Sequence, residues 1–156
     1  MSMPEFDEYD KKIIQYLQED SSISNIELSK KIGLAASSCL LRVKSLKEQK
    51  IIKQFTAIVD EKKLGFEITC FAKVAMAPLN RETSTKFIEE ATKIPEIIEC
   101  YTITGEAAFL IKVVAKNFQY YRDFVFDKLL AVPHVSNIET SIVVGTDKRS
   151  NVIPME

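Results

Sequence analysis

Apolar residues recur about one helical turn apart through the first third of the chain, and this spacing predicts three short helices. Their ranges are 10–18, 25–32 and 36–49. Their buried stripes are predicted to contain Ile13, Ile14, Leu17, Leu28, Ile32, Leu40, Val43 and Leu46, which leaves Cys39 exposed. Ser24 and Glu27 match a capping box before the second helix, and Gly33 matches its end. Two short helices joined by a glycine-containing turn are the skeleton of a helix-turn-helix.

The rest of the chain alternates between patterns typical of strands and of helices. Residues 51–60 are rich in β-branched residues, which predicts a short hairpin or wing. Strands are then expected over 67–77, 96–104, 107–115 and 135–144, with helices over 80–94 and from Asn117 to Pro133. The order β-α-β-β-α-β is that of a ferredoxin-like sandwich, so the predicted fold class is α+β. Its two helices cover one face of the sheet, and self-association would cover the other.

The charge distribution changes the meaning of the net charge, which is only −1. Residues 28–53 contain seven bases and one acid, so this window carries +6. Residues 1–27 carry −5 and residues 54–156 carry −2. A solvated lysine-rich surface would explain the charge alone equally well. Because the positive charge coincides with the predicted helix-turn-helix, it favours binding to the DNA phosphates.

Two groups of residues are the candidates for DNA contact. Contacts to phosphates are expected from Lys30, Lys31, Lys44, Lys47 and Lys53. Contacts to base edges are expected from Ser37, Ser38, Leu41, Arg42 and Ser45. The bidentate guanidinium of Arg42 suits guanine, but it suits a phosphate as well, so the sequence leaves both roles open.

Several other chemistries lack the residues that they need. The three cysteines lie about 30 residues apart, without a CxxC pair, and His134 is the single histidine. We therefore expect a reducing, cytoplasmic location, with no disulfide framework and no metal site. No nucleophile and base are paired by motif, so we expect no catalytic residues and no enzyme activity. The acidic start lacks the pattern of a secretory signal, and no apolar stretch is long enough to span a bilayer.

Motifs spread over about residues 6–154 resemble the Lrp/AsnC (feast/famine) family of transcription regulators. In the first third they are DEYDKKII at 7–14, ISNIELS at 23–29 and CLLRVKSL at 39–46. In the second half, PEIIEC at 95–100 and TGE at 104–106 resemble the family's RAM domain (regulator of amino-acid metabolism). The resemblance extends to the order of the two domains.

This resemblance implies a domain organisation and a set of partners. We expect a winged helix-turn-helix DNA-binding domain with its wing over 1–60, a linker over 61–66, and a ferredoxin-like effector-binding and oligomerisation domain over 67–156. The implied partners are double-stranded DNA, the chain itself as a homodimer and an octamer of dimers, and a small amino acid bound between dimers. No cofactor other than this possible amino-acid effector is implied.

The candidate effector site surrounds the Gly105 loop. By the resemblance it includes Thr102, Thr104, Gly105, Glu106, Ala108, Thr140 and Ser141. Family members often have Gly-Asp-x-Asp here, and their second Asp helps to hold the amino group of the effector. Ala108 replaces that Asp, so the sequence leaves open an amino acid, a different ligand or none.

Two further departures concern the DNA-binding domain. Family members usually have Ser followed by Pro where this chain has Ala35 and Ala36, so the N-cap of the third helix is expected to be weakened or moved to Ser37. They usually have Gly at the position of Lys50, so we expect a different cap at the end of that helix.

The function expected from these observations is sequence-specific regulation of transcription. An amino-acid-like effector would shift the equilibrium between assemblies and thereby change the occupancy of the operator. The alternative is a nucleoid-type architectural protein that wraps DNA independently of an effector. The length of the DNA footprint and its response to effectors would separate these two functions.

Overall fold

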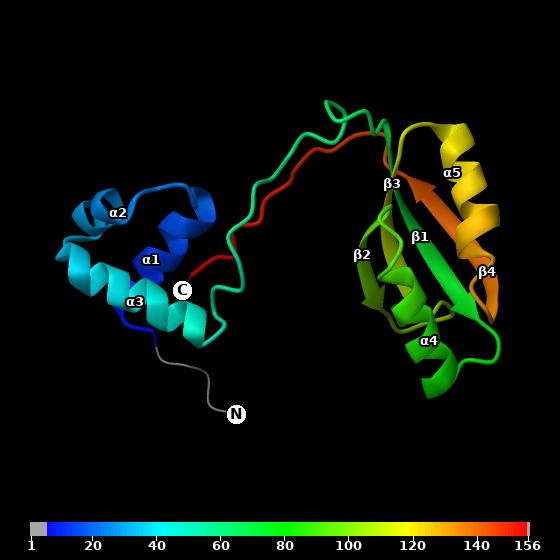
Figure 1. The fold of residues 1–156 in the computed structure, drawn as a ribbon, viewed down its shortest axis with the longest axis horizontal. Coiled ribbons are helices and arrows are strands. Elements are labelled where there is room, and N and C mark those ends of the chain that lie inside the picture. The colour runs from blue at the N-terminus through cyan, green and yellow to red at the C-terminus, as the bar shows by residue number, and fades with distance from the viewer. Residues whose placement is uncertain (1–5, 156) are drawn as a thin grey trace. The chain divides into compact units, whose positions relative to one another are not determined.

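The computed structural model describes residues 6–155 as two compact units. The first unit comprises the described residues up to Ile58, together with those from Lys148 onward, and the second comprises Val59–Asp147 (Figure 1). Residues 1–5 and Glu156 lie outside the described residues. The predicted start of the DNA-binding domain, and part of the acidic segment that was expected to lack a secretory signal, therefore lie outside them as well.

The first unit is built from the three predicted helices, which are α1 (Glu8–Glu19), α2 (Asn25–Ile32) and α3 (Ala36–Glu48). The local caps explain where they begin and end. The Ser24 side chain accepts a hydrogen bond from the backbone N–H of Glu27, and Gly33 ends α2 in the left-handed conformation. The core of this unit is formed by Ile13, Ile14, Leu28, Ile32, Cys39 and Leu46.

The predicted buried stripe of α3 was wrong by one residue at its first position. Cys39 is fully buried and Leu40 is 57% exposed. Half-buried Val43 and buried Leu46 lie on the side of Cys39, which places the small thiol against the core of the unit and turns Leu40 to its flank. The predicted exposure of Cys39 is therefore wrong as well, and burial raises the pKa of its thiol.

The predicted hairpin over residues 51–60 is absent. Ile51 and Ile52 pack against the core of the first unit, and both of their backbone N–H groups donate to the Leu46 carbonyl. Residues 53–60 form no strand. A physical reason is that 51–60 contains no Gly, Asn or Pro with which to form the tight turn of a hairpin.

The second unit has the predicted β-α-β-β-α-β order (Figure 1). The sheet order is β2-β3-β1-β4, and every pair of neighbours is antiparallel, which confirms the ferredoxin-like prediction. The elements are β1 (Ile68–Met76), α4 (Arg81–Ala91), β2 (Ile97–Thr102), β3 (Phe109–Ala115), α5 (Phe118–Phe124), the π-helix η1 (Val125–Leu129) and β4 (Val135–Ile142).

One face of this sheet carries the core of the second unit. Cys70, Ala72 and Val74 alternate along β1 and are fully buried. Phe87 of α4 stacks on Phe109 of β3 with 4.4 Å between ring centroids. The two helices pack into this same core, so the opposite face of the sheet has no helix on it within the described unit.

The segment from Lys148 returns to the first unit, where Figure 1 marks the C-terminus. The Gln18 side chain forms two hydrogen bonds with the backbone of Ile153. Its Nε2 donates to the carbonyl at 3.1 Å, and its Oε1 accepts from the N–H at 2.7 Å. Met155 packs against the core of the unit, so this tail is part of the N-terminal unit.

Candidate DNA-binding surface and effector cavity

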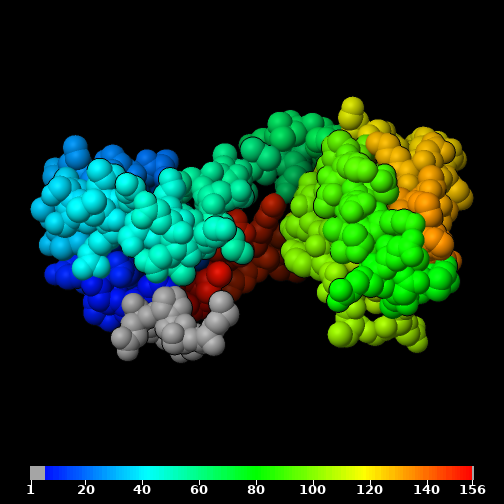
Figure 2. Space-filling view, turned by 60° about the horizontal axis from the view of Figure 1, so that its bottom comes forward, coloured from blue at the N-terminus to red at the C-terminus, as the bar shows by residue number. Residues whose placement is uncertain are grey.

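The outward face of α3 is the candidate surface for base contacts. At about 100° per residue, Ser37, Leu41 and Lys44 lie on the side opposite buried Cys39, and all three are exposed. Ser38 is exposed and Ser45 half-exposed on one flank of this face. Figure 2 shows α3, coloured cyan, open at the surface of the first unit. We call Ser37, Ser38, Leu41, Lys44 and Ser45 the outer face of α3.

Arg42 lies away from this outer face and joins α3 to the start of α1. Its Nη1 is 2.8 Å from Asp7 Oδ2 and 2.8 Å from Asp10 Oδ1, and its guanidinium is 5.4 Å from the ring centroid of Tyr9. The hydrogen bond with Asp10, followed in size by the one with Asp7, raises the pKa of Arg42. The guanidinium of Arg42, which was expected to contact guanine or a phosphate, is therefore bound by two carboxylates.

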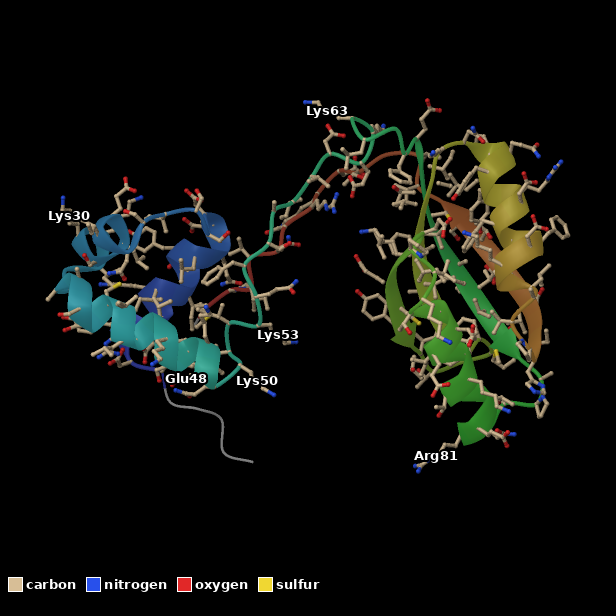
Figure 3. All side chains as sticks on the ribbon, in the orientation of Figure 1. Lys30, Glu48, Lys50, Lys53, Lys63 and Arg81 are labelled. Carbon is tan, nitrogen blue, oxygen red and sulfur yellow. The ribbon has the colours of Figure 1, made fainter. Side chains whose placement is uncertain are left out.

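The predicted phosphate-contacting lysines are distributed around the helices of this unit. Lys31 lies over the ring of Tyr16 at 5.3 Å and Lys47 over that of Phe55 at 5.4 Å, while Lys44 is 3.7 Å from Glu48. Figure 3 shows Lys30 on α2, and Lys53 beyond α3. The same figure labels Lys50 just after the end of α3, although it was not among the predicted contacts. Its position between Lys47 and Lys53 in the basic window was the signal that could have identified it.

The two ends of α3 show the effect of the departures from the family sequence. Ala35 occupies the N-cap without a side-chain hydrogen bond, so the helix is weakly capped and the cap has not moved to Ser37. At the other end, Lys50 adopts a φ of 58°, which is the left-handed conformation that glycine favours. Lys50 therefore keeps the backbone geometry of the glycine that it replaces.

A cavity of about 260 Å³ lies beside the loop between β2 and β3. Its lining is mostly polar and includes Lys73, Ile103, Thr104, Glu106, Asn137 and Glu139. Lys73 Nζ lies 3.4 Å from Glu139 Oε1 across the β1–β4 pair, so the cavity contains charges of both signs. Gly105 forms the turn of the loop, with a φ of 118°.

The structure brings only some of the predicted effector residues to this cavity. Thr104 and Glu106 line it, whereas Thr102 and Ser141 are exposed outside its lining. Ala108 is buried, and its N–H donates to the Val74 carbonyl. Thr140 lies on the helix-covered face, with its Oγ1 2.6 Å from the Tyr121 hydroxyl.

Three polar residues of the lining were missed in the sequence, namely Lys73, Asn137 and Glu139. They come from β1 and β4, where Lys73 alternates with buried residues and Glu139 with half-buried ones. That alternation was visible in the sequence as polar residues between apolar ones, but the partner strand was not.

No group of three potential metal ligands occurs among residues 6–155. Within the same range, no helix is long and apolar enough to cross a membrane.

The helix-turn-helix unit and the α+β unit with its polar cavity correspond to the two parts of a DNA-binding transcription regulator with a separate ligand-binding domain. The sequence pattern of winged helix-turn-helix DNA-binding domains matches residues 6–53, and that of the Lrp/AsnC ligand binding domain matches residues 69–153. The chain belongs to the Lrp/AsnC family and is a transcriptional regulator.

Individual relatives agree with this assignment. The chain is 52% identical to the transcriptional regulator AzlB of Bacillus subtilis over 96% of both chains, and 31% identical to the leucine-responsive regulatory protein of Rhizobium meliloti over 90% of both. Among solved structures, it is similar to a transcriptional regulator of Neisseria meningitidis in complex with L-Met, with a TM-score of 0.91 and 29% identity over 96% of this chain and 97% of that one. These relatives are regulators, which agrees with the expectation that the chain is not an enzyme.

Proposed function

We propose that α3 enters the major groove of an operator and that a small amino-acid-like effector, bound in the cavity beside Gly105, modulates operator occupancy. The observation that carries the DNA-binding part is the outer face of α3. It presents hydroxyl, methyl and ammonium groups to solvent, from a unit whose positive charge is concentrated on α2, α3 and the residues after them. In a helix-turn-helix protein, the second helix of the motif contacts the base edges.

The lysines supply the electrostatic part of the interaction. Lys30, Lys31, Lys44, Lys47 and Lys53 are proposed to contact phosphates and to set the register of α3, and we add Lys50 to this group. Because the chromosomal DNA of a bacterium or archaeon lies in the cytoplasm, the regulator is proposed to act there. Arg42 is excluded from the proposed direct contacts, because its guanidinium is bound by Asp7 and Asp10.

The effector part rests on the charges in the cavity. Lys73 is placed to attract a carboxylate, and Glu106 and Glu139 are placed to attract an ammonium group. Thr104 and Asn137 add neutral hydrogen-bonding groups. A volume of about 260 Å³ fits a small zwitterion. The carboxylates of Glu106 and Glu139 are proposed to replace the family Asp that is missing at Ala108.

Self-association is proposed to cover the free face of the sheet, first in a homodimer and then in an octamer built from four dimers. Tyr101 of β2 is 49% exposed, and Leu110 of β3 is half-buried on the face without helices. A face with such groups is expected to be buried by a second copy. Sedimentation velocity of the full chain tests this expectation, and a monomer at micromolar concentration would contradict it.

Calorimetric titration of the full chain with the twenty amino acids tests the effector proposal. At least one is expected to release or absorb heat, and Glu106→Gln should weaken its binding by about tenfold or more, because the ammonium loses a charged partner. Glu89→Gln on the exposed face of α4 is the matched control and should bind normally. If none of the twenty binds, the amino-acid effector is contradicted.

Footprinting separates the regulator from the architectural protein. Protection of discrete half-sites, whose extent changes with the effector that calorimetry identifies, supports the regulator. Protection that spreads uniformly and ignores that effector supports the architectural alternative.

A further inference from the structure

The outer face of α3 contains an exposed leucine at its centre. Leu41 is 67% exposed and lies between Ser37, one turn before it, and Lys44 and Ser45, one turn after it. A large apolar side chain on this face is exposed to water in the free protein, so it gains free energy when a partner covers it.

The same face lacks Arg, Asn and Gln, and Lys44 is its one side chain of the kinds that recognise guanine or adenine with two hydrogen bonds. Those are Arg or Lys for guanine and Asn or Gln for adenine. Arg42 points to Asp7 and Asp10, and the Gln49 amide donates to Ser45 Oγ at 2.9 Å. Lys44 is the one base among the five outer-face residues, and it lies 3.7 Å from Glu48. Besides Lys44, the groups that this face offers for direct recognition are the Ser hydroxyls and Leu41.

The surroundings of Leu41 identify the occupant as DNA rather than another protein surface. The window 28–53 carries +6, so it attracts a polyanion. In the major groove, the apolar group that a base edge offers is the C5-methyl of thymine. We propose that Leu41 is a specificity-determining residue that packs against a thymine methyl, so that the operator carries thymine beneath the first two turns of α3. This inference rests on the proposed entry of α3 into the major groove.

Leu40 provides an internal control, because it has the same side chain in a different direction. It is 57% exposed but lies about 100° around the helix from Leu41, on the flank that carries Lys47. A residue in that position faces the wall of the groove, where the sugar-phosphate backbone is the same for every base. Leu40 is therefore expected to contribute no preference for thymine.

The experiment removes the thymine methyl without changing base pairing. Duplexes are first selected from a random library with the full-length wild-type chain and then resynthesised with deoxyuridine in place of thymidine. Fluorescence anisotropy measures the dissociation constants of wild type, Leu41→Ala and Leu40→Ala for both versions of the duplex.

The expected result is a methyl effect that depends on Leu41. Loss of one buried methyl corresponds to about a fourfold weaker complex for wild type, in each half-site. Leu41→Ala should bind thymine and uracil duplexes equally, and Leu40→Ala should keep the fourfold difference. Because Leu41 is exposed, Leu41→Ala is expected to keep the helical circular dichroism of wild type.

Two outcomes would overturn the inference and remain distinguishable from failure of the proposed function. Equal affinity of wild type for both duplexes, or the same loss on uracil in Leu41→Ala, overturns the role of Leu41 while leaving DNA binding intact. If the wild-type chain selects no duplex from the library, the proposed entry of α3 into the major groove fails as well.

Discussion

A side-chain acceptor at the N-cap of α3, which Ala35 does not provide, should stabilise the first unit. Ala35 has φ −64° and ψ 143°, and the N-cap of α2, Ser24, has φ −69° and ψ 152°. Ser24 Oγ accepts a hydrogen bond from the backbone N–H of Glu27 at 3.2 Å. Because the two backbones are so similar, Ala35→Ser places its hydroxyl where it can accept from the N–H of Ser38. The free energy of unfolding of the first unit should rise by about 1 kcal/mol.

Urea unfolding followed by circular dichroism at 222 nm measures this change. Ser24→Ala is the reciprocal variant and should lower the free energy of unfolding by about 1 kcal/mol. Ala35→Val is the matched control and should not raise it, because valine supplies no acceptor and is as poor an N-cap as alanine. The dependence on urea should be the same for all variants. If Ala35→Ser has no effect while Ser24→Ala is destabilised, the inferred N-cap geometry of α3 is refuted.

Three further predictions concern other residues of the two units. Arg42→Ala and Asp10→Asn should both weaken DNA binding measured by anisotropy, because each removes an ionic contact between α3 and the start of α1. Tighter binding by Asp10→Asn, as expected from the loss of a negative charge alone, would contradict the positioning role of Arg42. Lys50→Gly should raise the free energy of unfolding in urea by up to about 1 kcal/mol, because it removes a left-handed non-glycine residue, and should at the same time weaken DNA binding; a stability below that of wild type would contradict this. Burial raises the pKa of Tyr121 to about 12, so between pH 10 and pH 12 the unfolded state releases the proton of this hydroxyl and the folded state keeps it. The free energy of unfolding should therefore fall as the pH rises over this range. Tyr121→Phe should flatten that slope. An unchanged slope in Tyr121→Phe would show that other groups cause the pH dependence.

The parts of the fold that follow from local sequence were predictable. The alternation from Ile68 to Met76 has the two-residue period of a strand with one buried face, and that face is the one on the core. Ser24 and Asn117 occupy the N-caps that their side chains favour. In α3, by contrast, Cys39 and Leu40 are both apolar, so the spacing alone fits either register. Packing against α1 and α2 decided in favour of the smaller side chain.

The candidate sites depended on contacts between residues far apart in the chain. Arg42 meets Asp10 over a separation of 32 residues, and nothing in the sequence near Arg42 indicates a carboxylate partner. Lys73 and Glu139 are 66 residues apart and are brought together by the antiparallel register of β1 and β4. Thr104 and Glu106 were found because they belong to one loop, whereas their partners in the cavity belong to strands.

We propose that the outer face of α3 contacts the bases of an operator while Arg42 only holds the helix in place. A crystal structure of the full chain with a selected duplex should show Ser37 and Leu41 in contact with base edges in the major groove, and Arg42 still bound to Asp7 and Asp10. Contact of Arg42 with a guanine or a phosphate, or an outer face of α3 that points away from the DNA, would contradict it.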